Sequence, residues 1–271
     1  MRLLKSGLVH VLVYGGALLA LTPFLWMVLT SLKSPAETFA FPPVLVPRDP
    51  QWENYAEVMR RVPWGRYVAN TLIVAAAQVA IIVVTSSLAA YAFARLAFRG
   101  RDALFLLLLG TLMLPGQVTL IPNFLLIHAL GWMDTYQALI VPGIATFLST
   151  FLFRQYFYTI PIELEEAARV DGCSRVGVLW RILLPLSKPV LAVVVLFRFL
   201  GAWDDFLWPL IVTSSTDMRL VMVGVAMFEQ EEGRAVHLLM AASTIVLAPV
   251  LVGFLFAQRY LIEGVQTTGL K

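Results

Sequence analysis

Three charged residues lie inside an otherwise apolar stretch of the sequence. Pro189–Val212 has 18 apolar residues among 24, yet it holds Arg198, Asp204 and Asp205. If this stretch crosses a membrane, its charges must face protein or a water-filled cavity, where such groups often mark a solute or ion pathway. Arg198 and Asp205 are seven residues apart, which is about 10 Å along one face of a helix. The three residues either form one polar strip, or the two aspartates mark the outer end of the helix.

A second group of polar residues follows prolines in another apolar stretch, Ala103–Met133. Gln117 comes two residues after Pro115, and Asn123 comes directly after Pro122. Carbonyls freed by such breaks often line a solute path together with polar side chains. Gln117 and Asn123 are therefore candidates for hydrogen bonds to solute hydroxyls. The alternative is a simple kink whose freed groups are satisfied by neighbouring helices.

The motifs of common catalytic and cofactor sites are missing from this sequence. It has no G-x-x-x-x-G-K-[ST] loop for nucleotide phosphates and no G-x-S-x-G or H-E-x-x-H motif. Its three histidines are far apart and lack metal-ligand spacing. We therefore expect a chain that is not an enzyme and that binds no cofactor or metal itself. If it moves a solute uphill, the energy must come from an ion gradient or from a partner.

The composition is that of an integral membrane protein. Of the 271 residues, 59% are hydrophobic and 14% are charged, whereas soluble domains have about 45–50% apolar and about 25% charged residues. The net charge is only +3 and the charges are spread between apolar blocks, so we expect no nucleic-acid partner. Cys173 is the single cysteine of the sequence, which excludes an intrachain disulfide.

Six apolar blocks are long enough to cross a membrane as helices. About 20 apolar residues span the hydrocarbon layer, and a helix satisfies its own backbone hydrogen bonds there. We therefore predict an all-α integral membrane protein with about six transmembrane helices, and we expect 1–271 to form a single transmembrane domain. Besides Pro189–Val212, the blocks are Ser6–Leu32, Tyr67–Ala94, Ala103–Met133, Thr135–Phe153 and Ala235–Gln258.

Lysine and arginine residues set the expected orientation. With six spans and the N-terminus inside, the inner segments hold 12 basic residues and the outer segments hold 7. Because basic residues concentrate on the cytoplasmic side, we expect a multi-pass protein with both termini in the cytoplasm. The first block, Ser6–Leu32, is longer than a signal-peptide core and does not end in a small-residue cleavage site, so we expect an uncleaved helix.

The long inner connection, Arg154–Lys188, has 9 charged residues in 35. Apolar periodicity predicts a helix over Ile162–Asp171, which Gly172 ends. A second predicted helix covers Ser174–Leu183 and stops at Pro185. The two helices form either a docking element for another protein or a merely solvated surface. The alanines on one face of the first helix favour docking, because a lipid-facing helix would carry larger apolar residues there; this face consists of Leu164, Ala167, Ala168 and Asp171.

Two outer connections are also distinctive. Lys33–Arg66 contains six prolines, which predicts an irregular cap with one short helix near Trp52–Arg61. Thr213–Val236 is polar at both ends and apolar over Leu220–Phe228 in the middle. This mixed pattern predicts a re-entrant or docking loop rather than a simple link.

The inner connection carries a motif that relates this sequence to a known family. The pattern EAA-x-x-x-G runs from Glu166 to Gly172, and after nine residues I-x-L-P runs from Ile182 to Pro185. This pattern resembles the EAA motif of binding-protein-dependent ABC importer permeases. Nearly the whole chain is similar to the sugar-importer, MalG-type branch of that family. The resemblance implies the MetI/MalG-like permease fold.

The resemblance also implies the partners and the mechanism. A second, non-identical permease subunit, two ABC ATPase subunits and an extracytoplasmic solute-binding protein complete such an importer, which lies among lipids in a bacterial or archaeal cytoplasmic membrane. ATP and Mg²⁺ bind to the ATPases, whose closure moves the coupling helices and rocks the permeases between inward- and outward-facing states. In this chain 154–188 is the implied cytoplasmic EAA loop, and 213–236 is the implied outer loop facing the binding protein. The residues implied to couple to the ATPase are Glu166, Ala167, Ala168, Asp171, Gly172, Ile182, Leu184 and Pro185.

Two other functions fit part of the sequence. An ion-coupled secondary transporter explains Arg198, Asp204 and Asp205 as coupling charges, but it does not explain the EAA spacing. A membrane scaffold is a third interpretation, and it predicts no dependence on any solute. The expected solute of a permease is a sugar or a related solute, because carriers of disaccharides, oligosaccharides, polyols and glycerol phosphate share these motifs.

Overall fold

The protein is almost entirely helical. A computed structural model describes residues 2–144, 146–231 and 235–268; the fold is 77% helix, and the described residues contain no strand. A π-helix covers Leu179–Leu183. The α-helices are α1 (Arg2–Ser31), α2 (Pro35–Thr38), α3 (Glu53–Arg61), α4 (Trp64–Arg95), α5 (Arg101–Gly110), α6 (Leu120–Ala129), α7 (Tyr136–Ile140), α8 (Leu148–Phe157), α9 (Ile162–Val170), α10 (Arg175–Val178), α11 (Leu184–Leu186), α12 (Lys188–Trp203), α13 (Leu207–Val212), α14 (Val221–Glu231) and α15 (Val236–Thr268).

Several helices have the length and composition of membrane spans. Three qualify alone: His10–Ser31 in α1, Trp64–Arg95, which is α4, and Val236–Gly253 in α15. Three bent pairs of helices qualify when each pair is taken as one span, which brings the number among the described residues to as many as six. The prediction of an all-α membrane protein with about six apolar helices is thereby confirmed.

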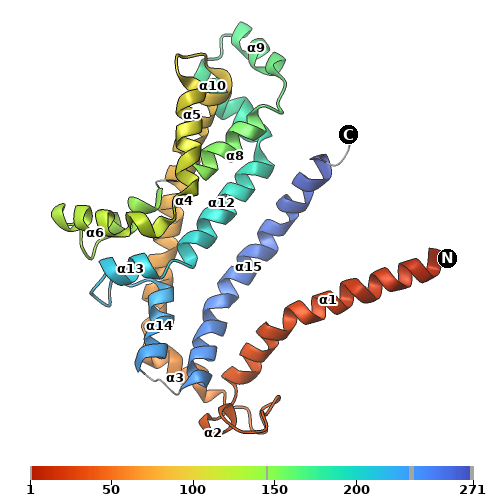
Figure 1. Cartoon of the computed structure of the whole chain (residues 1–271), viewed down its shortest axis with the longest axis vertical. Helices are drawn as coiled ribbons and strands as arrows, with labels where there is room; N and C mark the ends of the chain where they lie inside the picture. The colour runs from red at the N-terminus through yellow and green to blue at the C-terminus, as the bar shows by residue number, and fades with distance from the viewer. Residues whose placement is uncertain (1, 145, 232–234, 269–271) are drawn as a thin grey trace. The chain divides into compact units, whose positions relative to one another are not determined.

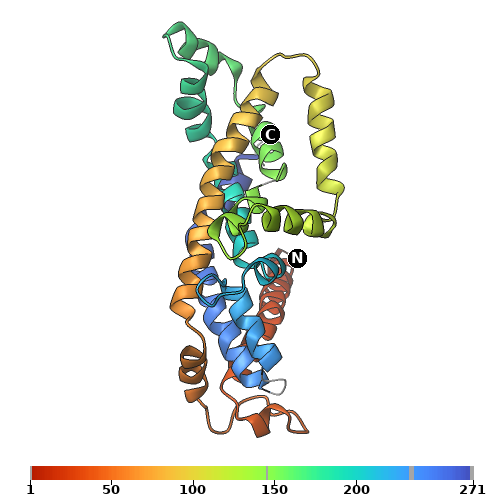
Figure 2. The same ribbon diagram turned by 90° about the vertical axis from the view of Figure 1, so that its left-hand side faces the viewer.

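The predicted block Ala103–Met133 is sharply bent. Its two halves, Arg101–Met113 and Gly116–Ala129, meet at 95° (Figure 2). Pro115 explains the break, because it has no backbone N–H and disfavours helical geometry in the residue before it. Leu114 accordingly has an extended backbone, with ψ of 125°. The bend is thus larger than a simple kink.

The expectation of one continuous span over Pro189–Val212 is wrong. α12 ends at Trp203 and α13 begins at Leu207, so α12 covers 16 residues. Asp204 and Asp205 lie in the link between the two helices. Aspartate side chains compete for nearby backbone groups and favour helix ends, and the carboxylate of Asp205 accepts a hydrogen bond from a backbone N–H in the first turn of α13.

Contacts divide the chain into two units. Unit 1 comprises Met1–Trp64 and Gly224–Val250. The short helix predicted in the proline-rich connection is α3, and it packs on the chain that follows α1. Asn54 of α3 donates hydrogen bonds to the carbonyls of Ser31 and Lys33, at 2.8 and 3.0 Å. These bonds tie the irregular connection to the end of α1.

Unit 2 comprises Gly65–Val223 and Leu251–Lys271. It holds two apolar clusters, and α4 contributes residues to both. One cluster joins α4 to α8, α10 and α12, and the other joins α4 to α6, α7 and α13. α4 is therefore the common element of unit 2, in which it is a long unbroken helix (Figures 1 and 2).

Candidate functional site

The first half of the Arg154–Lys188 segment folds nearly as predicted. α9 covers Ile162–Val170, one residue shorter than the predicted helix. Gly172 follows with φ of +84°, a conformation that glycine adopts without steric cost. The chain therefore turns at Gly172 between α9 and α10, as the sequence indicated.

The second half of the segment departs from the prediction. Helical structure begins at Arg175, passes through the π-helix and continues to Leu186, so Pro185 does not stop it. Proline is tolerated because it lies in the first turn of α11, where its missing N–H costs little. The sharp turn comes two residues later, where 175–186 and α12 meet at 85°. Ile182 and Leu184 are half-buried there.

The face of α9 that carries the motif is exposed. Glu166, Ala167 and Asp171 are all exposed, and the side chain of Val170 is 88% exposed. Ala168 is half-buried against the apolar cluster of α4 and α8. Acidic, small and apolar side chains thus lie together on a free surface, which is the kind of surface that another protein can contact closely.

The opposite side of α9 is held by one buried carboxylate. Glu165 is the buried residue of this helix. Its Oε1 accepts a hydrogen bond of 2.6 Å from the hydroxyl of Tyr91, and its Oε2 lies 3.5 Å from Nε of Arg95. The side chains of Arg95 and Glu165 are only 8% and 7% exposed. Tyr91 and Arg95 are one turn apart at the C-terminal end of α4, so α9 is attached to that end.

Arg95 also binds the end of α8. Its Nη2 donates hydrogen bonds to the carbonyls of Phe157 and Ile160, at 2.8 and 2.7 Å. These carbonyls lie where α8 ends and lack partners within that helix. A single guanidinium therefore joins the ends of α4 and α8 to α9.

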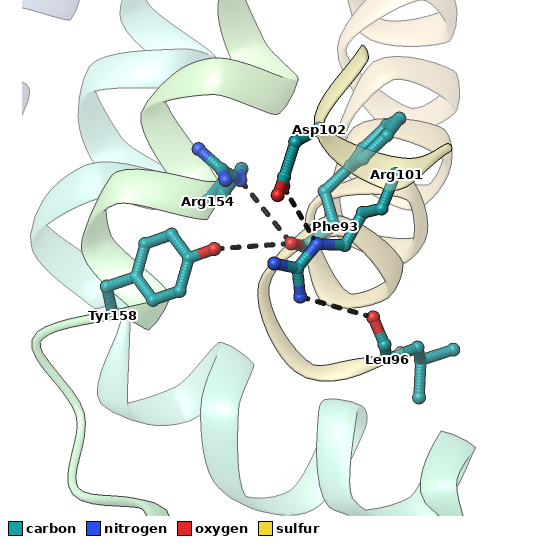
Figure 3. A network of polar contacts seen from close by, with 6 residues as sticks. All are labelled: Phe93, Leu96, Arg101, Asp102, Arg154 and Tyr158. Carbon is teal, nitrogen blue, oxygen red and sulfur yellow. Dashed lines mark hydrogen bonds and ion pairs between the residues drawn. The ribbon is translucent and has the colours of Figure 1, made fainter. Parts of the chain in front are cut away.

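A second polar network lies at the same end of α4. Figure 3 shows Arg154 and Tyr158 of the α8 end pointing at the carbonyl of Phe93, to which they donate hydrogen bonds of 3.4 and 3.3 Å. In the same view Arg101 donates to the carbonyl of Leu96. The guanidinium of Arg154 also lies over the ring of Phe105, 3.8 Å from its centroid. Both networks hold the C-terminal end of α4.

The middle of α4 forms a third polar contact, with the candidate residue Arg198. Gln78 is 2% exposed; its Nε2 donates to the carbonyl of Leu139 at 2.9 Å, and its Oε1 accepts from Nη2 of Arg198. Gly143 packs so closely here that a Cβ on it would lie 2.2 Å from the Gln78 amide nitrogen. Nε of Arg198 is buried without a hydrogen-bond partner among the described residues.

The other candidate residues for a solute path are scattered. Asp205 is half-buried and interacts electrostatically with Arg198, whereas Asp204 is exposed at the end of α12. Of the two earlier interpretations, the aspartates therefore mark a helix end, and Asp205 alone extends the polar strip. Gln117 is exposed and Asn123 is half-buried, and within the described residues neither contacts Arg198.

The N-terminal end of α4 grips the first part of the predicted outer loop. Nδ2 of Asn70 donates to the carbonyls of Asp217 and Arg219, at 2.7 and 3.1 Å. The next residue, Thr71, accepts a hydrogen bond of 3.0 Å from the backbone N–H of Val221. The apolar middle of the loop is helical, as α14, and residues 232–234 of the predicted loop lie outside the described residues.

The side chains of α4 and α9 that make these contacts were not predicted as site residues. Polar residues inside an apolar helical run were the available signal, because such residues are costly in a membrane unless they are partnered. Five of them follow one another along α4 and the sixth lies on α9, and they pair with residues far away in the chain. The missed residues are Asn70, Thr71, Gln78, Tyr91, Arg95 and Glu165.

The helices and their polar contacts define an α-helical membrane protein. Its helix α9 is exposed on one face and is attached to α4 through Glu165. Residues 55–266 match the family described as the binding-protein-dependent transport system inner membrane component. The chain belongs to this family and is a membrane permease subunit of a binding-protein-dependent ABC importer. Such a subunit is not itself an enzyme.

Proteins of similar sequence support the same assignment. The chain is 34% identical to the arabinooligosaccharides transport system permease protein AraQ of Halalkalibacterium halodurans, over 94% of this chain and 92% of the relative. It is 37% identical to the trehalose/maltose transport system permease protein MalG of Thermococcus litoralis, with 94% and 93% covered. It is 33% identical to the sn-glycerol-3-phosphate transport system permease protein UgpE of Yersinia enterocolitica, with 94% of each covered.

A solved structure has the same fold. A chain of a bacterial ABC transporter involved in the import of the acidic polysaccharide alginate superposes with a TM-score of 0.82 at 24% identity, covering 94% of this chain and 96% of that one. The ion-coupled secondary transporter considered above has no support from these relationships.

Proposed function

We propose that this chain couples ATP hydrolysis on partner ATPase subunits to the uptake of a sugar or a related polyhydroxylated solute. The exposed face of α9 is the observation that carries the proposal, because an energy-coupling helix must be accessible to a partner. In this role Glu166 is the charged contact to an ATPase subunit, while Ala167 and Ala168 allow close approach. Gly172 turns the chain, and the half-buried Ile182 and Leu184 hold the segment on the bundle.

The complete importer contains this chain, a second non-identical permease, two ABC ATPases and an extracytoplasmic binding protein. Both termini and the 154–188 segment lie in the cytoplasm in this proposal, as the excess of basic residues on that side predicts. The 213–236 segment then lies outside and faces the binding protein. The relatives are named as transport system permeases for arabinooligosaccharides, for trehalose/maltose and for sn-glycerol 3-phosphate, which supports a sugar or a related solute.

The solute path is proposed to pass Arg198. This residue is held by Gln78 in the middle of α4 and has a buried Nε without a partner among the described residues. Its guanidinium can donate hydrogen bonds to hydroxyl or anionic groups. Asp204, Asp205, Gln117 and Asn123 remain candidates for further contacts along the path.

Coupling is tested by reconstituting the purified importer in liposomes and measuring solute uptake and ATP hydrolysis together. Glu166→Lys should leave the subunits assembled but abolish uptake driven by ATP. Asp49→Lys, an equally large charge change at an exposed residue of unit 1, is the control and should transport normally. Normal uptake by the Glu166→Lys importer would refute the assignment of α9 as the coupling helix.

A further inference from the structure

α4 contacts other parts of unit 2 at three levels. Its C-terminal end binds α9 through Glu165, its middle binds Arg198 through Gln78, and its N-terminal end binds the 217–221 stretch through Asn70 and Thr71. All of these α4 residues are buried or nearly so. One helix thus joins the proposed coupling helix, the proposed solute path and the proposed outer loop.

α4 has the sequence of a straight, stiff helix. Thr71 and Tyr91 are 20 residues apart, which is about 30 Å along a helix. The 32-residue sequence of α4 contains no proline, and its single glycine, Gly65, is its second residue. Sharp kinks in helices almost always come from proline, glycine–serine pairs or inserted groups. A displacement of one end of α4 is therefore carried to the other end.

The covalent neighbours of α9 are poorly suited to carry its movement. On one side the chain passes through the non-helical residues 158–161 to α8, and on the other side it turns at Gly172 before α10. Neither link continues a neighbouring helix into α9, so α9 has no unbroken helical connection to α8 or α10. The buried contact of Glu165 with Tyr91 and Arg95 joins α9 laterally to a long helix instead.

We propose that Glu165, Tyr91 and Arg95 form the joint through which movement of α9 reaches α4, and that α4 carries it to Gln78 and Asn70. The three residues act by positioning α9 on α4 and touch neither solute nor nucleotide. This inference rests on the proposed function of α9 as the coupling helix, and it adds the route inside the subunit.

The joint is tested with Glu165→Gln and Tyr91→Phe in the reconstituted importer, with Glu163→Gln as the matched control. Glu163 is an exposed glutamate two residues away on the same helix. We expect both joint variants to assemble with the ATPases and to hydrolyse ATP, while the number of solute molecules carried per ATP falls at least about tenfold, within the range of coupling energies between sites. The control should keep the wild-type ratio.

A distance measurement on the otherwise wild-type importer gives a second readout, which does not depend on how the variants fold. Spin labels at Leu88 of α4 and Val170 of α9, both exposed, are introduced with Cys173→Ala, and their separation is measured without nucleotide and with trapped ATP. One narrow distance should persist in both states of the otherwise wild-type importer and broaden in Tyr91→Phe. A wild-type distance that changes between the two states would overturn the joint, whether or not the variants assemble.

The outcomes separate this inference from the proposed function. If Glu166→Lys uncouples the importer while Glu165→Gln and Tyr91→Phe keep a normal ratio of solute to ATP, the joint is refuted and the coupling helix stands. If Glu166→Lys transports normally, the proposed function itself fails.

Discussion

The two ends of α4 hold their neighbours in different ways. At the C-terminal end, charged and polar side chains meet: the carboxylate of Glu165 lies between the hydroxyl of Tyr91 and the guanidinium of Arg95. At the N-terminal end, Asn70 grips the backbone carbonyls of Asp217 and Arg219 instead. The first contact depends on the identity of three side chains, whereas the second depends on one amide and on a loop conformation.

This difference predicts different sensitivities to mutation. A buried ion pair becomes costly when one partner is removed, since the remaining charge is left uncompensated. Hydrogen bonds to backbone carbonyls cost less to lose, and the carbonyl groups that accept them are present whatever the side chain. The C-terminal end of α4 should therefore tolerate few substitutions, and the loop at the N-terminal end should tolerate many.

The largest effect is expected for Arg95→Met. It leaves Glu165 without its cation and removes the guanidinium that donates to the carbonyls of Phe157 and Ile160, of which that of Phe157 keeps the backbone N–H of Ile160 as a donor. We expect a loss of about 3–5 kcal/mol of stability, seen as a marked drop in the melting temperature of the detergent-purified importer. Arg99→Met, an exposed arginine just beyond α4, is the control and should melt near the wild type. If Arg95→Met and Arg99→Met had equal melting temperatures, the C-terminal end of α4 would not be the end that is more sensitive to mutation.

A smaller effect is expected for Asn70→Leu at the other end. The change keeps the volume but removes the amide that donates to two carbonyls, of which that of Asp217 keeps Nε of Arg66 as a donor, and it leaves the hydroxyl of Tyr136 without its acceptor. We expect a loss of about 1–3 kcal/mol, measured in the same melting experiment. Gln137→Leu removes an exposed amide nearby and should change little. A loss of stability larger than that of Arg95→Met would show that the N-terminal end of α4 is the end that is more sensitive to mutation.

A third variant tests the turn that positions α9. Gly172 has φ of +84° and open space where a Cβ would lie, so alanine there meets only backbone strain, of about 1–2 kcal/mol. Gly172→Ala should lower the melting temperature slightly and reduce solute uptake. Gly172→Asn should be milder, because asparagine tolerates this conformation better. If alanine were as benign as asparagine, the positive φ would not be needed for α9 to keep its place.

The smallest effect concerns Asp134, which also holds the outer loop. Although desolvation opposes it, hydrogen bonds from Ser215 and Ser214 and the charge of Arg219 hold the pKa of Asp134 below its usual value. Because the folded pKa is depressed, the stabilisation is present above an ordinary pKa of about 3.9 and is lost as the pH falls through the lower, folded pKa. For a partly exposed group it should be under about 1 kcal/mol.

The measurement is the difference in melting temperature between the wild type and Asp134→Asn across this pH range. The advantage of the wild type should be constant near neutral pH and shrink below about pH 4. A difference that grows on acidification would show that the ionised carboxylate does not stabilise the loop.

Much of the fold followed from the sequence, because the requirements of a membrane are local. Apolar runs of about 20 residues that cross a membrane must be helices, and the position of Gly172 directly after the predicted helix indicates the turn there. The sequence did not predict helix ends correctly where a proline or an aspartate can either end a helix or lie within continuing helical structure. Pro115 bends its block by 95°, whereas Pro185 lies inside continuing helical structure, and the aspartates after Trp203 end α12 early.

By itself, the sequence determined the class of protein, its apolar helical character and the motif on α9. Only the tertiary structure decided which polar residues of α4 have partners, since Tyr91 and Glu165 are separated by 74 positions and Gln78 and Arg198 by 120. Hydropathy reflects the free-energy cost of placing a residue in an apolar layer, but the packing of the folded chain determines which partner offsets that cost. The attachment of α9 through a single buried carboxylate is therefore a property of the folded chain.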